Sequence, residues 1–380
     1  MKDDVNILTT GDFCPIRRYE SQMTKPPQEV LGDLYNTIKQ ADFTFTNLEC
    51  PITNFQTPIK KTGPALKTNS SALDFLNSAG IKYVTLANNH ILDYGNRGLD
   101  DTLKSLKVKK INYLGAGANF YEASKPMIIE KNGLKIAILN FAENEWSTTF
   151  YNAPGASPIH PVRNYKSIQN AKKIADRVVI ISHGGHEMYK YPSPRMKELF
   201  RFYVDAGADA VLNHHTHCTS GYEIYNKAPI FYSLGNFLFD NNTATNNIWN
   251  EGMAVNLKIS KESISFKIIH FNQANDNAIL EICNEEETTD RINKIEKINA
   301  IIQDDSMLSD EFNLWIQSQK KMFNAFIEPR SIPFLTALQS RKILPSLWNK
   351  RKKMFLLNLI KCEAHQDILV SILKDDVSNT

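Results

Sequence analysis

The stretch Asp209-Ala210-Val211-Leu212-Asn213-His214-His215-Thr216-His217 places a cluster of histidines directly behind a short apolar run. Short apolar runs rich in β-branched residues are typical of buried strands. Alternate residues of an extended strand point to the same side. We therefore expect His215 and His217 to face one site if the segment stays extended, and His214 to face away from it.

Four more strand-like runs of the chain end in polar residues that can bind metals. These are Thr10-Gly11-Asp12, Asn47-Leu48-Glu49, Leu86-Ala87-Asn88-Asn89-His90 and Ile181-Ser182-His183. Strands alternate with helical segments as far as residue 215, and pairs of strands follow, which indicates a layered α/β domain with some antiparallel strands. Because ligands of open α/β sheets gather at the carboxyl ends of strands, we expect these polar side chains to meet.

Carboxylate, amide and imidazole groups at strand ends predict a metal site, and their number indicates two metal ions. Glu49 can bridge two cations through its two oxygens. The remaining candidate ligands are Asn89, His183 and His215 for one ion, and Asp12 and His217 for the other, with Cys14 as a further candidate two residues after Asp12. A small buried filler residue is the other interpretation of Cys14. Mixed oxygen and nitrogen ligands suit Mn, Fe or Zn better than Ca or Mg.

A metal site of this kind points to hydrolytic chemistry. Two metal ions about 3.5–4 Å apart can hold a phosphate group and lower the pKa of a bridging water. His90 directly follows Asn89 in the chain. It is the candidate general acid that protonates the leaving oxygen. The sequence therefore predicts a metal-dependent hydrolase, with His90 and Asn89 as its catalytic residues.

Charged residues near the same segments predict a surface that binds an anionic substrate. The candidates are Lys61, Lys67, Arg97, His186 and Glu187. The three cations could bind phosphate or carboxylate groups, and ordinary solvated cations are an equally good interpretation. His186 is a candidate substrate contact, whereas Glu187 could orient a ligand histidine.

Length and composition limit the broad class of the protein. The chain has 380 residues, of which 42% are hydrophobic and 22% are charged, as in ordinary globular proteins. A net charge of +3 is too small to indicate a nucleic-acid partner. No apolar stretch approaches the roughly 20 residues of a membrane span. The first residues lack the features of a secretory signal, so we expect a cytoplasmic location with the five cysteines reduced.

The sequence pattern changes near residue 274, after which apolar residues recur at helical spacing, as in Ile292, Ile295 and Ile298. We therefore expect a metal-binding domain over residues 1–273 and a helical region over residues 274–380. This helical region is a candidate docking surface for a partner protein. The basic run Lys350-Arg351-Lys352-Lys353 could also touch an anionic membrane surface, although a solvated helix face is the simpler interpretation.

The ordered motifs of residues 5–270 resemble those of a known family. They are Gly11-Asp12, Asn47-Leu48-Glu49, Asn88-Asn89-His90 with Asp93-Tyr94-Gly95, His183-Gly184-Gly185-His186-Glu187, His215-Thr216-His217 and Tyr232-Ser233-Leu234-Gly235-Asn236-Phe237. The set resembles the CapA family of capsule and poly-γ-glutamate synthesis proteins, a branch of the calcineurin-like metallophosphoesterase superfamily. The resemblance implies a four-layer α/β/β/α sandwich with a dinuclear site at the strand ends, followed here by a helical appendage.

The chain departs from the superfamily pattern at two positions. The first motif usually carries a histidine two residues after its aspartate, and Cys14 stands there. The final motif usually opens with glycine, and Asn213 takes its place. Both departures bear on whether two metals bind and whether the protein is catalytic.

Two functions remain open from the sequence. The first is a metal-dependent phosphoesterase-like hydrolase in capsule, exopolysaccharide or poly-γ-glutamate biosynthesis, acting on an anionic glycan, a phosphorylated substrate or a γ-glutamyl substrate. The alternative is a non-catalytic accessory subunit of a polymer synthase or export complex that keeps a metal or ligand site. Nucleic-acid processing is disfavoured because the charge is near balance.

Overall fold

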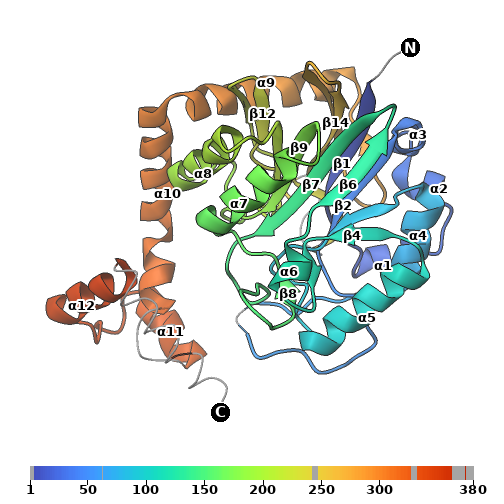
Figure 1. Ribbon diagram of the computed structural model, residues 1–380. Coiled ribbons are helices and arrows are strands. Elements are labelled where there is room, and N and C mark those ends of the chain that lie inside the picture. The colour runs from blue at the N-terminus through green and yellow to red at the C-terminus, as the bar shows by residue number, and fades with distance from the viewer. Residues whose placement is uncertain (1–3, 62, 242–246, 327–331, 362–372, 374–380) are drawn as a thin grey trace. The chain divides into compact units, whose positions relative to one another are not determined.

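The computed structural model describes residues 4–61, 63–241, 247–326, 332–361 and 373 (Figure 1). The chain divides into two compact units, residues 1–309 and residues 310–380. The boundary expected between residues 273 and 274 lies inside the first unit. There β16 (Glu281–Ile282) pairs with β15 (Ile264–Asn272), and α9 (Glu285–Gln303) packs against β11 (Tyr222–Tyr225).

The first sheet is mixed and has β1 at its centre. Its order is β16, β15, β14 (Glu251–Ile259), β1 (Val5–Cys14), β2 (Phe43–Leu48), β3 (Tyr83–Thr85) and β4 (Asn112–Leu114). β1 to β4 run parallel, β14 to β16 are antiparallel, and β13 (Asn236–Phe239) adds a short parallel pairing to the end of β1. The carboxyl ends of β1, β2 and β3 therefore lie at one edge of this sheet.

The second sheet is also mixed, and its parallel strands are at the centre. Its order is β11, β12 (Ala228–Phe231), β10 (Ala210–His214), β9 (Arg177–His183), β7 (Leu134–Ala142) and β6 (Met127–Lys131). β7, β9, β10 and β12 are parallel, and the two outer strands are antiparallel to their neighbours. β9 and β10 end side by side, with His183 in register with His214.

The two sheets pack face to face around a shared apolar core. That core combines Ile7 and Phe45 of the first sheet with Ile138, Val179 and Leu212 of the second sheet, all of them buried. Leu8, the neighbour of Ile7, belongs instead to the core on the other face of the first sheet. This alternation follows from the pleat of β1, whose successive side chains point to opposite faces.

Helices cover the outer face of each sheet, which completes the four α/β/β/α layers expected from the sequence. On the first sheet lie α1 (Arg18–Gln22), α2 (Pro27–Leu31), α3 (Leu34–Gln40), α4 (Ser71–Ala79) and α5 (Gly95–Val108). On the second sheet lie α7 (Pro161–Lys172) and α8 (Pro194–Asp205). Figure 1 shows the two helical layers on opposite sides of the strands. A short α6 (Phe120–Ala123) and the strand pair β5 (Ala116–Gly117) and β8 (Gly155–Ala156) lie between β4 and α7 in the sequence.

The second unit consists of helices in the part of it that the structure describes. α10 (Asp305–Phe326) begins in the first unit and continues into the second, which also holds α11 (Pro333–Ser340) and α12 (Lys350–Lys361). Large apolar side chains are exposed on these helices, including Leu314, Phe334 and Phe355. Among the described helices, none combines the length and the apolar character needed to cross a membrane.

Candidate metal centre and its pocket

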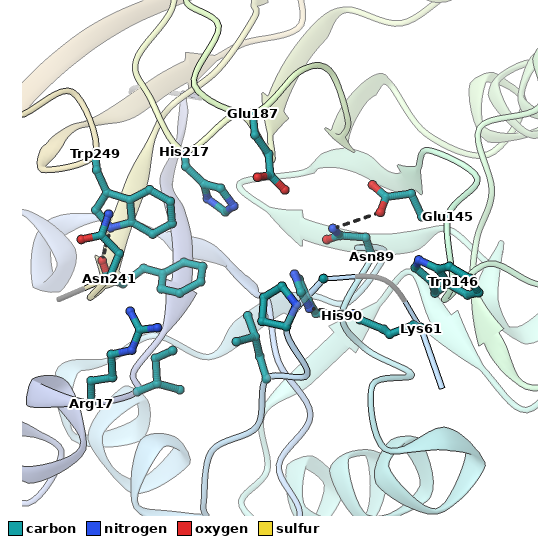
Figure 2. A pocket seen from close by; sticks show the side chains of 15 residues that line it. Arg17, Lys61, Asn89, His90, Glu145, Trp146, Glu187, His217, Asn241 and Trp249 are labelled. Carbon is teal, nitrogen blue, oxygen red and sulfur yellow. Dashed lines mark hydrogen bonds between the residues drawn. The ribbon is translucent and has the colours of Figure 1, made fainter. Parts of the chain in front are cut away.

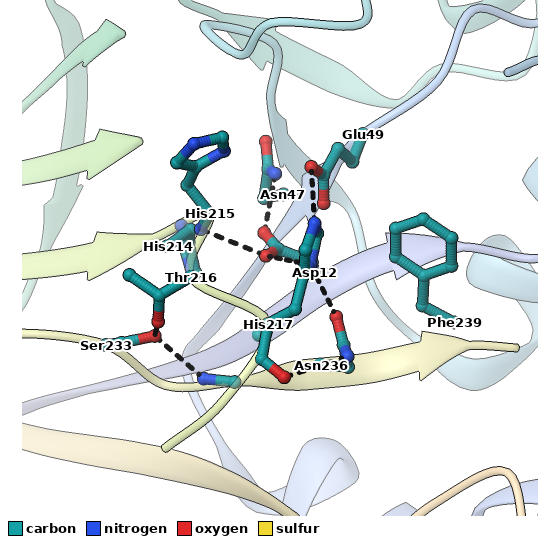
Figure 3. A network of polar contacts seen from close by, with 12 residues as sticks. Asp12, Asn47, Glu49, His214, His215, Thr216, His217, Ser233, Asn236 and Phe239 are labelled. Atoms are coloured by element: carbon teal, nitrogen blue, oxygen red, sulfur yellow. Dashed lines mark hydrogen bonds and ion pairs between the residues drawn. The ribbon is translucent and has the colours of Figure 1, made fainter. Parts of the chain in front are cut away.

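Two overlapping groups of buried side chains meet where the strand ends of the two sheets converge. Glu49, His183 and His215 form one group, and Asp12, Glu49 and His217 form the other. Within each group the possible ligand atoms all lie within 4.8 Å of one another. Figure 3 shows four of these side chains, all but His183, gathered around the ends of β1, β2 and β10. Glu49 belongs to both groups, so its carboxylate lies between them.

The Glu49 carboxylate is fully buried, and neither of its oxygens has a hydrogen-bond partner among the described residues. Its Oε1 lies 3.5 Å from His183 Nε2 and 3.7 Å from His217 Nε2. Burial, and then the neighbouring carboxylate of Asp12, raise the pKa of Glu49 well above its usual value. A buried carboxylate without a hydrogen bond is costly, and a cation between the two groups would remove that cost. The residues present therefore fit a divalent metal ion.

His183 supplies a neutral imidazole to the first group. Burial, followed by the nearby rings of His215 and His214, lowers the pKa of His183 well below its usual value. A neutral ring is the form that binds metals. Its Nε2 lies 3.0 Å from Asn89 Oδ1 and 3.1 Å from His215 Nδ1. The Asn89 amide oxygen therefore joins the first group as a further candidate ligand.

The final histidine motif reaches the centre through a turn, which corrects the expectation of an extended segment. β10 ends at His214, and His215 and His217 then adopt positive φ angles of 93° and 54°. Residues other than glycine rarely occupy this region, and such strain is concentrated at functional sites. His214 lies outside both ligand groups, and its Nε2 donates to the Thr10 carbonyl at 2.9 Å.

Amides and a backbone N–H hold the second group in place. Asp12 Oδ1 accepts a hydrogen bond from Asn47 at 2.7 Å, and Oδ2 accepts from the backbone N–H of His215 at 3.0 Å. His217 Nδ1 donates to Asn236 Oδ1 at 3.0 Å, which leaves Nε2 for the side facing Glu49. The sequence interpretation missed the roles of Asn47 and Asn236, although both lie within motifs that it had singled out.

Cys14 lies in neither ligand group, although the sequence made it a candidate ligand. Its thiol hydrogen-bonds with Cys50, and both belong to a small apolar cluster that includes Leu66 and Phe239. Burial, and then this hydrogen bond, raise the pKa of Cys14 well above its usual value, which disfavours the thiolate that a metal requires. Cys14 lies two residues after Asp12, which is about 6.6 Å further along the strand. At that distance its neighbour is Cys50 and not the ligand groups.

A solvent-open cavity of about 180 Å³ adjoins the metal centre. Asn89, His217 and Glu187 line it, together with His90 and Lys61. Figure 2 shows His90 and Asn89 near the middle of this pocket, with His217 and Glu187 above them. A substrate in the pocket would therefore contact the candidate ligands and His90 together.

Lys61 is buried beside His90, where the sequence allowed either a substrate-binding or a solvated cation. Its side chain is 4% exposed and forms an ion pair with the fully buried Asp93. Asp93 Oδ2 also accepts from His90 Nδ1 at 2.6 Å and from the Leu66 backbone N–H at 2.7 Å. Lys61 Nζ lies 3.3 Å from the same His90 nitrogen. This buried cluster fixes the ring of His90 at the wall of the pocket.

Three of the predicted substrate contacts lie elsewhere among the described residues. Lys67 binds the Phe55 carbonyl at 2.6 Å, and Arg97 pairs with Asp101 on the surface of α5. His186 packs near Tyr189, and burial lowers its pKa. None of these three predicted contacts lines the pocket, whereas Glu187 does.

Glu145 is a site residue that the sequence interpretation missed. Its Oε1 lies 3.6 Å from His215 Nε2, and its Oε2 accepts from Asn89 Nδ2 at 3.4 Å. His215 Nδ1 is the ring nitrogen directed at His183. A carboxylate on the outer nitrogen of a ligand histidine fixes its tautomer and orientation. Glu145 can therefore orient both His215 and the Asn89 amide, and no motif marks it because it lies in the loop after β7.

We expect the Glu145→Gln substitution to weaken metal binding by about 10- to 100-fold, because losing a partner of a ligand histidine commonly has an effect of that size. Titration of Mn²⁺ into metal-free protein measures the change. Trp146→Phe is the matched control, since Trp146 lies in the same loop and lines the same pocket. Equal metal affinity in the wild type and the Glu145→Gln variant would contradict the orienting role.

The fold and the centre together define the class of the protein. A four-layer α/β/β/α sandwich with histidine and carboxylate groups at its strand ends is the architecture of calcineurin-like metallophosphoesterases. Within that class, residues 6–241 match the family described as bacterial capsule synthesis protein PGA_cap. The chain belongs to this family, as the motif resemblance indicated.

Named relatives agree with this membership. The chain is 37% identical over 246 residues to the PGA biosynthesis protein CapA of Bacillus subtilis (strain 168), which covers 63% of this chain and 64% of that protein. It is 35% identical over 214 residues to the capsule biosynthesis protein CapA of Bacillus anthracis, which covers 53% and 52%. The chain thus spans less than two thirds of the length of either relative. A solved hypothetical protein from Thermus thermophilus aligns with a TM-score of 0.44 at 14% identity, over 70% of this chain and 99% of that chain.

Proposed function

We propose that this protein is a metal-dependent phosphoesterase-like hydrolase that acts in capsule, exopolysaccharide or poly-γ-glutamate biosynthesis. The observation that carries the proposal is the buried Glu49 carboxylate, which has no hydrogen-bond partner among the described residues and lies between two histidine-containing groups that adjoin an open pocket. The biosynthetic setting is supported by the names of two relatives, a PGA biosynthesis protein and a capsule biosynthesis protein.

We propose two divalent ions, with Glu49 as the shared ligand. Asn89, His183 and His215 would hold one ion, and Asp12 and His217 would hold the other. Their oxygen and nitrogen donors suit manganese, iron or zinc. When bound, such ions polarise a phosphoryl oxygen and lower the pKa of a coordinated water.

His90 is the proposed general acid. Its Nδ1 is held by the buried Asp93 carboxylate at 2.6 Å, so Nε2 is the ring nitrogen that can pass a proton to a substrate in the pocket. Asp93 and Lys61 keep the ring in one orientation and contribute no proton themselves. In this proposal, His90 Nε2 is the atom that gives the proton to the leaving oxygen.

The His90→Ala variant is expected to keep its metal and to lose about 10²- to 10⁴-fold in kcat, the usual contribution of a general acid. The measurement is hydrolysis of p-nitrophenyl phosphate and bis-p-nitrophenyl phosphate with added Mn²⁺, together with the metal content of each protein. Unchanged turnover in the variant would exclude His90 as the acid. No turnover in the wild type on any phosphoester would overturn the hydrolase proposal itself.

An accessory role is the second candidate function, and the exposed apolar side chains of the second unit favour it. Leu314, Phe334 and Phe355 are 67%, 70% and 67% exposed. Exposed apolar side chains on all three described helices of this unit are available to contact a partner protein. A relative in Mycobacterium tuberculosis is named a probable polyglutamine synthesis accessory protein. This role predicts bound metal without turnover, and loss of a polymer-synthase complex when residues 310–380 are deleted, because residues 1–309 form a compact unit of their own.

A further inference from the structure

We infer that Arg17 forms an anion-binding subsite of the pocket, next to an apolar wall made by Phe239 and Trp249. This subsite would hold a carboxylate or phosphate group of the substrate beside the group that reaches the metal centre. The inference rests on the proposed function in that it assumes a substrate in this pocket. It adds a substrate class, namely molecules that carry a second negative charge.

The charge of Arg17 has no carboxylate partner among the described residues. Arg17 is exposed and lines the pocket, and its Nη1 donates to the Asp240 carbonyl at 3.0 Å, which is a neutral acceptor. The Asp240 carboxylate is instead bound by the next residue, Arg18, at 2.7 and 2.9 Å. Lys61, the other lysine or arginine that lines the pocket, is neutralised by Asp93. Among the described residues that line the pocket, Arg17 is therefore the cation that is free to bind an anionic group of the substrate.

Arg17 is also held in a backbone conformation that most residues avoid. Its φ is 56° and its ψ is −122°. Strained residues of this kind persist where the surrounding structure enforces them, and they are concentrated at ligand sites. The strained backbone of Arg17 agrees with the placement of its side chain at the pocket.

Aromatic rings connect this side of the pocket to the metal centre. The His217 ring lies 4.6 Å from the Trp249 ring and 5.2 Å from the Phe239 ring, measured between centroids. Trp249 Nε1 donates to the Phe239 carbonyl at 2.7 Å, which fixes the indole. Asp240, whose carbonyl binds Arg17, directly follows Phe239. An anion at Arg17 would therefore share the cavity with a candidate metal ligand, and the rings offer an apolar wall for the part of the substrate in between.

The charges of the pocket are distributed unevenly, which would orient a substrate. Figure 2 shows Arg17 and Trp249 on one side of the pocket, and Glu145 and Trp146 on the other. The carboxylates of Glu145 and Glu187 repel an anion, and Arg17 attracts one. A substrate with two negative groups would therefore place one at the metal centre and the other at Arg17.

The test is equilibrium binding to the Mn²⁺-loaded full chain, measured by calorimetry with matched probes. Glucose 1-phosphate has one anionic group, whereas glucuronate 1-phosphate and glucose 1,6-bisphosphate add a carboxylate or a second phosphate. Tri-γ-glutamate carries carboxylates and no phosphate. We expect the wild type to bind at least one of the doubly anionic sugars about tenfold or more tightly than glucose 1-phosphate, since a charged hydrogen-bonded contact has that size. The preferred probe then separates a carboxylate from a phosphate.

Arg17→Ala should abolish that preference and leave the affinity for glucose 1-phosphate unchanged, and it should weaken tri-γ-glutamate if the wild type binds it. Arg17→Lys should restore part of the preference, because the charge returns without the planar guanidinium. Lys104→Ala, which removes an exposed cation of α5, is the control and should change nothing. The inference is overturned if the wild type has no preference for a second anion, or if Arg17→Ala weakens all probes equally. If the wild type does not hydrolyse any phosphoester, the hydrolase function is contradicted. The difference in affinity between singly and doubly anionic probes can still be measured in that case.

Discussion

Replacing Glu49 with glutamine is expected to empty both metal sites and to lower turnover on the order of a thousand-fold or more. Glu49 belongs to both candidate ligand groups, and a neutral amide cannot supply its charge to an ion in either of them. Metal ions in such centres contribute several kcal/mol of transition-state stabilisation, and each 1.36 kcal/mol is about tenfold in rate. The loss should therefore exceed that of any residue that contacts only one group.

The prediction is tested by measuring the metal content and the thermal unfolding of the wild type and of the Glu49→Gln variant. Bound Mn²⁺ should raise the melting temperature of the wild type and leave that of the Glu49→Gln variant unchanged, because only a folded state that binds the ion is stabilised. After treatment with a chelator the variant should be at least as stable as the wild type, since it no longer buries a carboxylate that lacks a hydrogen-bond partner among the described residues. A variant that binds two equivalents of metal would contradict the shared-ligand role.

Replacing Asp93 with alanine is expected to lower the free energy of unfolding by about 3–5 kcal/mol, the usual result of removing one partner of a buried ion pair. Asp93 is fully buried, and its loss leaves the charge of Lys61 in a site where that side chain is only 4% exposed. The same change removes the partner of His90 Nδ1, so turnover should fall as well. Urea denaturation and the phosphoester assay measure the two effects separately.

A double variant tests the physical reason for that loss. Adding Lys61→Met to Asp93→Ala removes the unpaired charge, so much of the stability should return while turnover stays low. Asp100→Ala is the matched control, because Asp100 and Lys104 form an exposed pair worth no more than about 1 kcal/mol. If the double variant is less stable than Asp93→Ala alone, the buried charge of Lys61 is not the cause.

The class of fold was predictable from local patterns. Apolar runs with β-branched residues marked the strands, and their alternation with helices indicated the layers that the two sheets and their helices form. The strand ends indicated where the site would form, because the carboxyl ends of parallel strands lie at one edge of a sheet. Asp12, Glu49, Asn89 and His183 follow or end such strands, and the structure brings them together.

The course of the chain beyond the strand ends was not predictable in the same way. Alternate side chains point to the same side only while the backbone stays extended. His215 and His217 instead reach the metal centre through a turn in which both residues have positive φ angles. Cys14 keeps the strand spacing, yet its neighbour is Cys50, whose position depends on how β2 pairs with β1. The spacing of residues in the sequence therefore indicated which side chains could bind a metal. It did not predict which of them are in contact.

By itself the sequence determined the layered fold and the set of groups at the strand ends, because both follow from short-range periodicity. Only the tertiary structure decided which charges meet. It buried Lys61 against Asp93, 32 residues away, and brought Glu145 to His215 from the loop after another strand. It also left Arg17 beside the pocket without a carboxylate partner among the described residues, since Arg18 binds Asp240. These contacts join loops that follow different strands of the same sheet, and the order in which the strands pair sets the distances between those loops.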